Sequence, residues 1–538
     1  MHTLKRIFSA PNTAILLLLL HPVLFYRRVL ITVATHVPYD IENYHFPTLA
    51  LIARSIRQHQ WPFWDPYTYA GMPLHADMQA QLFYPPAWLA IAAGNVSQGR
   101  HLFYWVEWLN PLHMMLGGVF TWVLLRRMNL RSPAALTGAT VYQLGGYFAS
   151  QACHLGAICA GAWLPLAILA VHELRERFRP RWFAALAVAI ALTILAGFAA
   201  ATLVVCGAVI LFAAALLFRR ETSWRRFAVL GGSLAGSFVL AALISAVELI
   251  PLMRLTGQSI ASTRSEWLTA WGIPPEALMS LIRPDYYGIF DLSRYQLHFN
   301  FTLMYVYHGM APLGLLAIAA FQRRARTLLT LTVLCACWML GEHTPLYGLI
   351  FGHLPGLIRG ASYAWYAMMA FGLFAGMTAA VALDGMSRRI PESAMWAVAL
   401  VTSADLLLVG SDRPMNSAPG GYALSSSEYQ FGAKPEDLAR LRALTDISVP
   451  PLRIDYADIW SPGILQAGML RLPTSDGNIP FMSARMYRLR QLYCATEPNA
   501  RDRAAAGAES PIFRRDLPVV RFDSPLIRMT NTGYVASL

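Results

Sequence analysis

The sequence is poor in charged residues. Asp, Glu, Lys and Arg make up only 14% of its 538 residues, whereas they account for about a quarter of a typical soluble protein. Hydrophobic residues account for 56%. This composition excludes an ordinary soluble globular chain and predicts a membrane protein.

Lysine is almost absent, because only Lys5 and Lys434 stand against 41 arginines. A Walker-type phosphate loop requires a lysine in its glycine-rich motif, and Schiff-base chemistry requires a lysine amine. Both kinds of enzyme are therefore excluded. The net charge of +13 does not indicate nucleic-acid binding, since membrane proteins concentrate arginine in their cytoplasmic loops. We expect no nucleic-acid partner.

The motifs of common soluble enzymes are also missing. The chain contains no HExxH, no CxxC and no GxSxG sequence. Five of its six cysteines lie in or beside apolar stretches, namely Cys153, Cys159, Cys206, Cys335 and Cys337. Neither a disulfide framework nor a zinc knuckle follows from this spacing. We predict no metal ligands, although the chemistry considered below is compatible with a divalent cation as cofactor.

Long apolar runs are abundant, and those near twenty residues predict transmembrane helices. We expect about eleven, at residues 12–28, 101–125, 133–150, 155–173, 182–197, 199–218, 227–250, 301–321, 327–341, 361–384 and 391–410. The apolar run from Trp182 to Phe218 is too long for one crossing, so we divide it into a hairpin near Gly197. The first segment follows a basic start without a small-x-small cleavage site, which favours an uncleaved helix over a signal peptide.

Arginine is distributed unevenly between alternate loops. Eighteen cations fall in the short segments beside Lys5, Arg127, Arg177, Arg225, Arg324 and Arg388. The long segments 29–100 and 251–300 hold far fewer per residue. The positive-inside rule therefore predicts a cytoplasmic N-terminus. An odd number of helices then places residues 411–538 outside.

The chain divides into two predicted domains. Residues 1–410 form the multi-helix membrane domain, with outer loops at 29–100 and 251–300. The tail begins with a linker at 411–430, followed by a short helix at 434–445 and an alternating strand-like stretch at 451–460. We expect a small α/β extracytoplasmic domain over 411–538.

The first outer loop is the most informative segment. Its residues 47–61 form an amphipathic stretch with Leu49, Ile52 and Ile56 on one side, typical of a helix at the membrane interface. Asp40 lies at the mouth of this loop, where a carboxylate can take a proton from a hydroxyl group while a lipid-borne group approaches from the bilayer. Alternatively, Asp40 caps a helix that begins near Asn43. Glu107 and Glu248 lie within apolar helices, where a structural hydrogen bond is as good an explanation as catalysis.

Outer arginines are scarce, and they are candidates for binding phosphate, because arginine binds phosphate in a bidentate manner and keeps its charge at an interface. The candidates are Arg254, Arg264, Arg283, Arg294 and Arg359. Contact with anionic lipid headgroups is an equally good explanation. His75, His308 and His343 could serve the same purpose, although isolated histidines are more often structural.

Segment 63–86, FWDPYTYAGMPLHADMQAQLFYPP, resembles the first outer loop of the YfhO family of bacterial membrane proteins. Further segments are similar to that family in the same order: VELIPLMRLTGQSIASTR at 247–264, MSLIRPDYYG at 279–288, the late helix at 351–386, and GMLRLPTSDGNIPFMSARMYRLRQL at 468–492. The resemblance thus covers most of the chain.

The resemblance implies an all-α membrane protein of the GT-C glycosyltransferase superfamily. Such a protein uses a polyprenyl-phosphate-linked sugar donor at the outer membrane face and transfers the sugar to a cell-envelope glycan or lipid acceptor. The resemblance places the catalytic base at Asp40. Substrate-binding residues are expected at Glu42, His75, Asp77, Arg264, Arg283 and Arg359.

Two other functions agree with the same residues. A flippase of a lipid-linked saccharide would need the arginines but no base. A scaffold protein would tolerate the loss of every outer acid.

Overall fold

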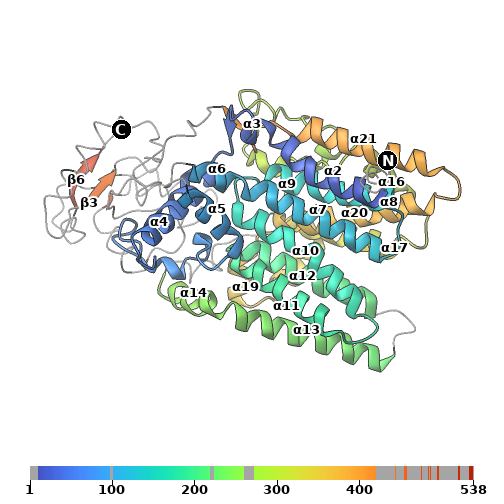
Figure 1. The fold of residues 1–538 in the computed structure, drawn as a ribbon, viewed down its shortest axis with the longest axis horizontal. Helices are drawn as coiled ribbons and strands as arrows, with labels where there is room; N and C mark the ends of the chain where they lie inside the picture. The colour runs from blue at the N-terminus through green and yellow to red at the C-terminus, as the bar shows by residue number, and fades with distance from the viewer. Residues whose placement is uncertain are drawn as a thin grey trace.

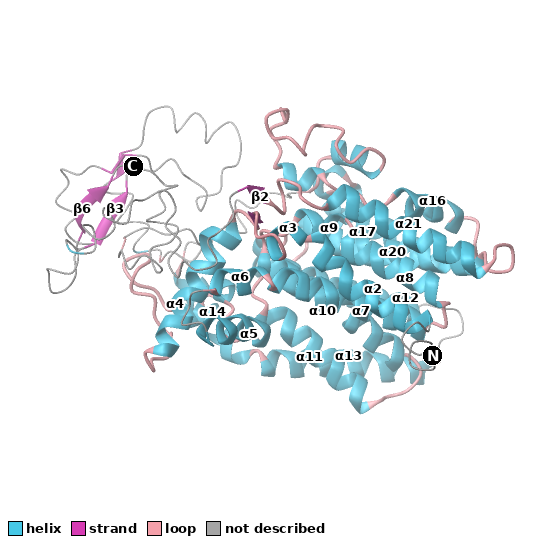
Figure 2. Ribbon diagram, turned by 45° about the horizontal axis from the view of Figure 1, so that its top comes forward, coloured by secondary structure: helices cyan, strands magenta, loops and turns pink. Residues whose placement is uncertain are grey.

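The computed structural model describes residues 10–96, 101–217, 223–259 and 272–419, together with short stretches beyond residue 440. Long helices run side by side along the molecule, and the short elements of the first loop gather at one end (Figure 1). Helix dominates the described chain, and the strands are few and short (Figure 2).

Helix is present in each of the eleven predicted segments. The bundle helices are α2 (Ala10–Phe25), α6 (Leu102–Glu107), α7 (Leu109–Arg127), α8 (Ser132–Leu144), α9 (Gly146–Ser150), α10 (Leu155–Leu174), α11 (Pro180–Leu195), α12 (Ala199–Leu217), α13 (Trp224–Ile244), α14 (Ala246–Gln258), α16 (Met310–Ala319), α17 (Arg326–Met339), α20 (Met368–Gly385) and α21 (Glu392–Gly410). Within the described ranges, six helical segments are long and apolar enough to cross a membrane, and four apolar helices are shorter. The chain is a multi-pass membrane protein, and eleven crossings stay a prediction.

Helices α8 and α20 form the centre of the bundle. All thirteen residues of α8 are buried, as are residues Met368–Asp384 of α20. The two backbones approach closely, because a Cβ atom added at Gly138 would lie 2.6 Å from the carbonyl oxygen of Gly376. Small residues permit such approach, and close packing replaces the hydrophobic effect as the force that joins helices in lipid.

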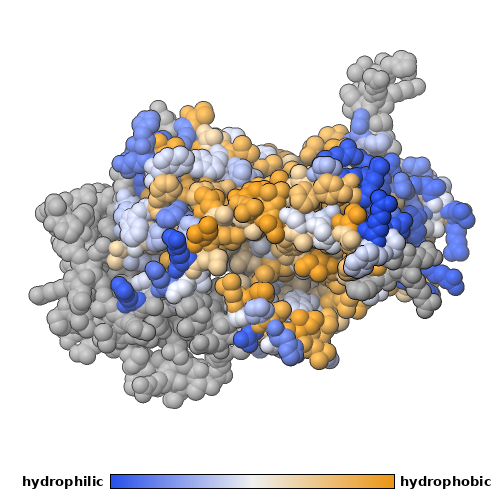
Figure 3. All heavy atoms as spheres, turned by 90° about the horizontal axis from the view of Figure 1, so that it is seen from below, coloured by the Kyte–Doolittle hydropathy of each residue, from blue (hydrophilic) through white to orange (hydrophobic). Residues whose placement is uncertain are grey.

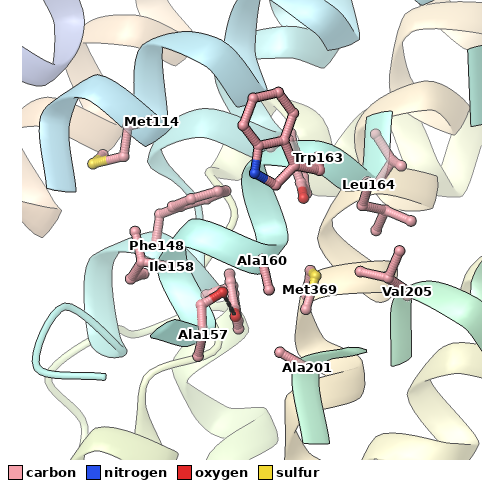
Figure 4. Close-up of a cluster of buried hydrophobic side chains, with 14 of the residues drawn as sticks. Met114, Phe148, Ala157, Ile158, Ala160, Trp163, Leu164, Ala201, Val205 and Met369 are labelled. Atoms are coloured by element: carbon pink, nitrogen blue, oxygen red, sulfur yellow. Dashed lines mark hydrogen bonds between the residues drawn. The ribbon is translucent and has the colours of Figure 1, made fainter. Parts of the chain in front are cut away.

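Helix α10 packs beside this centre and is buried along almost its whole length. Figure 4 shows the bulky side chains of Phe148, Ile158 and Trp163 around small residues such as Ala157 and Ala160. Large and small side chains thus interlock in this cluster, as dense packing requires.

A buried amide links three helices near the same centre. Gln143 on α8 donates from Nε2 to the carbonyl oxygens of Leu18 on α2 (2.7 Å) and Met114 on α7 (3.0 Å). Its Oε1 lies 3.2 Å from His21 Nδ1. Since an unpaired amide in an apolar interior costs several kcal/mol, this arrangement fixes the relative positions of the three helices.

The helices at the periphery of the bundle expose apolar side chains. Examples are Leu20 on α2, Val239 and Leu243 on α13, and Val401 and Leu408 on α21. In Figure 3 such side chains form an apolar band, with hydrophilic side chains gathered at its ends. A band of this kind suits contact with lipid tails.

The turns between helices separate into two ends of the bundle. At one end, which we call the basic end, Arg127, Arg175, Arg226 and Arg324 border a common cavity although they come from four different turns. The first loop packs at the other end, which we call the loop end. This segregation of arginine agrees with the predicted orientation, in which the basic end faces the cytoplasm, and that orientation stays a prediction.

The hairpin predicted near Gly197 is present. Helix α11 ends at Leu195 and α12 begins at Ala199. Gly197 has a φ of +84°, and a Cβ there would lie 2.0 Å from the carbonyl oxygen of Met78. Only glycine therefore fits at this turn, which touches the first loop.

The first loop contains α3 (Arg27–Leu30), β1 (Thr35–His36), the π-helical turn η1 (Ile41–His45), α4 (Phe46–Arg57), the short turns η2 (Leu74–Ala76) and η3 (Met78–Ala80), and α5 (Pro85–Val96). Helix α4 confirms the predicted amphipathic helix, and it buries Leu49 and Ile52 within the protein. Arg27, the first residue of α3, pairs with Asp412, which follows α21.

Later loop elements are η5 (Pro275–Leu281), η6 (Phe301–Met304), η7 (Gly341–His343), α18 (Pro345–Phe351), α19 (Gly356–Ala361) and η8 (Ala364–Ala367). They connect the later helices of the bundle.

The start of the predicted linker is fixed to the bundle, so that prediction is wrong for residues 411–419. Asn416 is buried and donates from Nδ2 to the carbonyl oxygens of Ala149 and Gly410, each at 2.9 Å. Strand β2 (Ala418–Pro419) pairs antiparallel with β1. An asparagine that satisfies two buried carbonyls explains why the chain continues along the bundle here.

Two strand pairs are described farther along the tail. Strand β3 (Arg453–Tyr456) pairs parallel with β6 (Thr532–Ala536), and β4 (Cys494–Ala495) pairs antiparallel with β5 (Val519–Val520). The strand predicted within 451–460 is therefore present. The predicted helix at 434–445 lies outside the described residues apart from a single position, and the separate domain stays a prediction.

Replacing Gly138 by Ala tests the central packing. The added methyl group would also lie 2.9 Å from Ala380 Cβ, so the helices must separate, and overpacking of this kind costs about 1–3 kcal/mol. We expect a lower melting temperature in detergent for Gly138→Ala. The control is Gly207→Ala on α12, where a Cβ meets nothing within 4 Å, and it should lose no stability. Equal melting temperatures for the two variants would contradict this account.

Candidate functional site

Buried polar contacts hold the first loop against the bundle. The hydroxyl group of Tyr84 lies 2.6 Å from His113 Nε2 on α7 and accepts a 2.9 Å hydrogen bond from Trp163 Nε1 on α10. Gln81 donates from Nε2 to the carbonyl oxygen of Ala196, in the α11–α12 turn, at 2.8 Å. The acids of the loop therefore occupy defined positions.

Asp40 immediately precedes η1, but its side chain makes no capping hydrogen bond. This finding removes the alternative in which Asp40 serves only as a helix cap. The side chain is 43% exposed, and its Oδ2 atom lies 3.8 Å from Nε2 of His154 in the turn before α10. The carboxylate is thus held beside an imidazole and remains accessible.

Hydrogen bonds around Gln151 orient this imidazole. The Nε2 group of Gln151 donates to Ser150 Oγ (3.1 Å) and to the carbonyl oxygen of Thr302 (3.3 Å). Its Oε1 therefore faces His154 Nδ1, at 3.0 Å, and accepts the Nδ1 proton. The other ring nitrogen of the neutral imidazole then presents its lone pair toward Asp40, so the two residues together can bind a proton.

Partial desolvation by the surrounding protein shifts the pKa values of Asp40 and His154 in the directions that favour their neutral forms. Desolvation raises the pKa of the Asp40 carboxyl group, and His154 opposes the shift. Desolvation likewise lowers the pKa of His154, opposed by Asp40, and it lowers the pKa of the nearby His45 to about 3. A carboxylate with a raised pKa is a stronger proton acceptor than an ordinary aspartate.

Aromatic rings surround the pair. The His154 ring lies 5.9 Å from that of Phe198, which follows the Gly197 turn, and 6.0 Å from that of Tyr366 on η8. Tyr39, with a φ of +64°, places its ring 6.0 Å from that of Phe301 on η6. Five segments distant in sequence therefore meet at Asp40.

Sequence reasoning did not identify His154, Phe198 or Tyr366 as site residues. His154 lies in a short turn between two apolar runs, as expected for a helix boundary. A sequence feature that points to a site is that His154 lies at the same end of the predicted helices as the acidic first loop.

The other predicted acids of the first loop are engaged. Glu42 is 16% exposed, and its Oε2 lies 3.3 Å from His36 Nε2. Asp77 is only 3% exposed; it accepts hydrogen bonds from the Tyr44 hydroxyl group and, at 3.0 Å, from the backbone amide of Gln79. Asp40 is thus the most accessible carboxylate of the three, and substrate binding by Glu42 and Asp77 stays a prediction.

The predicted His75 is also engaged. Its Nδ1 atom lies 2.9 Å from the carbonyl oxygen of Phe63, and its ring packs against the Phe63 ring. This contact stabilises the turn that follows Trp61 in the first loop.

The predicted arginines differ in their surroundings. Arg264 lies outside the described residues. Arg283 is exposed and lies over the ring of Tyr286. Arg359 on α19 is only partly exposed, and its buried Nε atom has no hydrogen-bond partner within the described chain. Arg359 is therefore the described candidate with an unsatisfied donor.

Two buried acids occupy contrasting sites. Glu107 accepts a 2.8 Å hydrogen bond from the backbone amide of Val37, which explains its position in an apolar helix. Glu248 on α14 is 2% exposed, and neither carboxyl oxygen has a partner within the described residues. Burying a carboxyl group without a hydrogen-bond partner is costly, so Glu248 is the less well explained of the two acids.

A metal ion does not fit the donor set. Wherever the structure describes side chains, no three His, Cys, Asp or Glu residues lie close enough together to hold one. Asp40 and His154 supply two such groups, so we derive no step through a metal.

The family comparison bears on part of this site. The family described as "Bacterial membrane protein YfhO" has a sequence model that aligns with the middle of the chain. Residues 82–341 match the YfhO family. The resemblance found in the sequence is thereby confirmed over this range. The YfhO match includes His154 and Phe198, while Asp40 and Arg359 lie outside it. No curated protein matches the sequence significantly.

The chain is similar to solved structures of membrane proteins. The archaeal oligosaccharyltransferase AglB from Archaeoglobus fulgidus, in complex with an inhibitory peptide and a dolichol-phosphate, is similar with a TM-score of 0.52 and 11% identity, over 99% of this chain and 70% of AglB. ArnT from Cupriavidus metallidurans, bound to undecaprenyl phosphate, has a TM-score of 0.47 and 11% identity, over 87% of this chain and 86% of ArnT. The likeness to AglB establishes a common fold.

The burial of Asp77 gives stability a pH dependence. Desolvation raises the pKa of Asp77 to about 6, against the hydrogen bonds from Tyr44 and Gln79. The folded protein binds this proton more tightly than the unfolded chain does. The contribution of protonated Asp77 to the free energy of unfolding is therefore complete below about pH 4 and is lost as the pH rises through 6. The loss is roughly 3 kcal/mol.

Asp77→Asn removes this titration while keeping the acceptor oxygen for Tyr44. We therefore expect the melting temperature of Asp77→Asn, relative to wild type, to be higher at pH 7.5 than at pH 4. Thermal unfolding in detergent at the two pH values measures the difference. A difference that does not change with pH would rule out a raised pKa at Asp77.

Proposed function

We propose that this protein is a membrane glycosyltransferase that transfers a sugar from a polyprenyl-phosphate donor to a cell-envelope glycan or lipid acceptor. The observation that carries the proposal is the accessible Asp40 carboxylate beside His154 at the loop end. The shared fold with AglB, an oligosaccharyltransferase solved with dolichol-phosphate, supports the same reaction class.

The proposed reaction is an inverting transfer in which Asp40 acts as the base. An Asp40 oxygen takes the proton from the acceptor hydroxyl group. As this proton leaves, the acceptor oxygen forms a bond to the anomeric carbon of the donor sugar. The bond between this carbon and the donor phosphate oxygen breaks, and the polyprenyl phosphate leaves with the electron pair. His154 Nε2, whose lone pair faces Asp40, can also accept this proton.

The proposal also assigns an orientation. The loop end and residues 411–538 lie outside the bacterial inner membrane, and the N-terminus and the basic end lie in the cytoplasm. The uneven distribution of arginine supports this assignment.

Asp40→Asn tests the base. Asparagine keeps the size of the side chain and lacks the basicity, so turnover should fall by about 10²–10⁴, the usual contribution of a general base. Donor binding should persist. Glycan transfer from a lipid-phosphate donor by the purified protein measures the effect.

Asp291→Asn is the matched control, because Asp291 is an exposed acid that lies outside the first loop and pairs with Arg294, three residues further along its own loop. This variant should transfer sugar at the wild-type rate. Near-normal transfer by Asp40→Asn would remove Asp40 as the base. Movement of a lipid-linked sugar across vesicles by a wild-type protein that transfers none would favour a flippase instead.

Arg359 is the proposed partner of the donor phosphate. It lies on α19, seven residues before Tyr366, whose ring contacts His154. Its buried Nε–H group has no partner within the described residues, and a phosphate oxygen would satisfy that donor. A charge-assisted hydrogen bond of this kind contributes about 1.5–3 kcal/mol.

Arg359→Ala should therefore weaken polyprenyl-phosphate binding by about tenfold or more. Arg388→Ala is the control, since it removes an exposed arginine from the turn between α20 and α21 and is not among the expected substrate-binding residues. Binding of polyprenyl phosphate to the purified variants in detergent measures the effect. If both variants bind like wild type, the phosphate contact belongs to a residue other than Arg359.

A further inference from the structure

A cavity of about 690 Å³ opens at the basic end of the bundle. It is formed where α7, α10, α12 and α20 end and where α13 and α17 begin. Its size falls within the range of small-molecule sites in proteins, about 300–1,000 Å³.

The cavity is distinct from the Asp40 site. Helix α10 connects them, because His154 precedes its first turn and His172, in its last turn, lines the cavity. Eighteen residues of helix correspond to about 27 Å. The two sites thus lie at opposite ends of the bundle and cannot share one headgroup.

The rim of the cavity carries excess positive charge. Arg127, Arg175, Arg226 and Arg324 line it, and Glu176 is the acid among the lining residues that the structure describes. Glu176 is shared, since its carboxylate lies 2.8 Å from Arg226 and 3.8 Å from Arg175.

The other two arginines differ, because Arg324 has an acidic partner outside the cavity lining and Arg127 has none within the described chain. Arg324 pairs at 3.2 Å with Asp384, which also accepts a hydrogen bond from the backbone amide of Arg131. Arg127 is exposed and, within the described chain, has no acidic partner within 4 Å. An anion bound here would meet guanidinium groups that are not all committed to acids.

The inner wall of the cavity is apolar. Phe212 and Leu216 on α12, Leu230 on α13 and Val381 on α20 form part of it. An inorganic anion gains nothing from such a wall, whereas an acyl chain does. Basic residues at the rim and apolar residues inside therefore match a ligand with an anionic head and a hydrocarbon tail.

We propose that this cavity binds an anionic phospholipid, with the phosphate among the rim arginines and an acyl chain against the α12 wall. Arg127 and Arg226 come from separate turns, so the lipid would join α7 to α13. The site would be independent of sugar transfer at the loop end.

Titration of purified protein in detergent with short-chain phosphatidylglycerol tests this site. The double variant Arg127→Gln, Arg226→Gln should bind this lipid at least about tenfold more weakly than wild type. The control double variant, Arg177→Gln, Arg225→Gln, removes the same charge from exposed neighbours outside the cavity lining and should bind within about twofold of wild type. Melting temperatures without lipid verify that both variants are folded.

Two further probes identify the ligand. Phosphatidylcholine with the same chains and inorganic phosphate should both bind wild type far more weakly than phosphatidylglycerol. Equal losses in the two double variants would overturn the proposal, because the binding would then reflect the overall charge of the basic end. Binding of inorganic phosphate as tight as that of the anionic lipid would also overturn it in favour of a site for free phosphate.

Discussion

The close approach of α8 and α20 is the constraint on which the bundle depends. Lipid tails are as apolar as the helix surfaces, so burying leucine between helices gains little in a membrane. Contact at Gly138 and Gly376 instead brings the two backbones together. Gln143, one turn and a half along α8, then satisfies carbonyl groups on α2 and α7. Packing and a few obligatory hydrogen bonds thus determine where the helix ends lie.

The positions of those helix ends determine which polar side chains lie close enough to interact. At the loop end, most acids are already satisfied: Asp77 by Tyr44, and Glu107 by a backbone amide. Asp40 differs because neighbouring contacts fix its backbone while its carboxylate is free of a capping hydrogen bond. His154, held by Gln151, completes the pair. A rigid scaffold that leaves one carboxylate uncommitted is what a proton acceptor requires.

Much of this architecture followed from the sequence. The lengths of the apolar runs predicted the helical segments. The break at Gly197 was predicted because the run from Trp182 to Phe218 is too long for a single crossing. Asp40 was identified from its place at the mouth of the first loop. His154 and Tyr366 were missed because their contacts join segments more than a hundred residues apart, which no local pattern encodes. The fixed segment 411–419 was missed because its polar composition resembles a linker, although Asn416 bonds to buried carbonyls.

The turn at Gly197 has a consequence for the surrounding bilayer. Helix α11 has only 16 residues, a length of about 24 Å, while the hydrocarbon layer is about 30 Å thick. A crossing by α11, which stays a prediction, would require the bilayer around this hairpin to thin or the flanking polar groups to extend to water. Gly197 lies directly against Met78, so a shift of the hairpin along the membrane normal would also displace the first loop. Bilayer thickness would then influence the surroundings of His154, whose neighbour Phe198 belongs to the same turn.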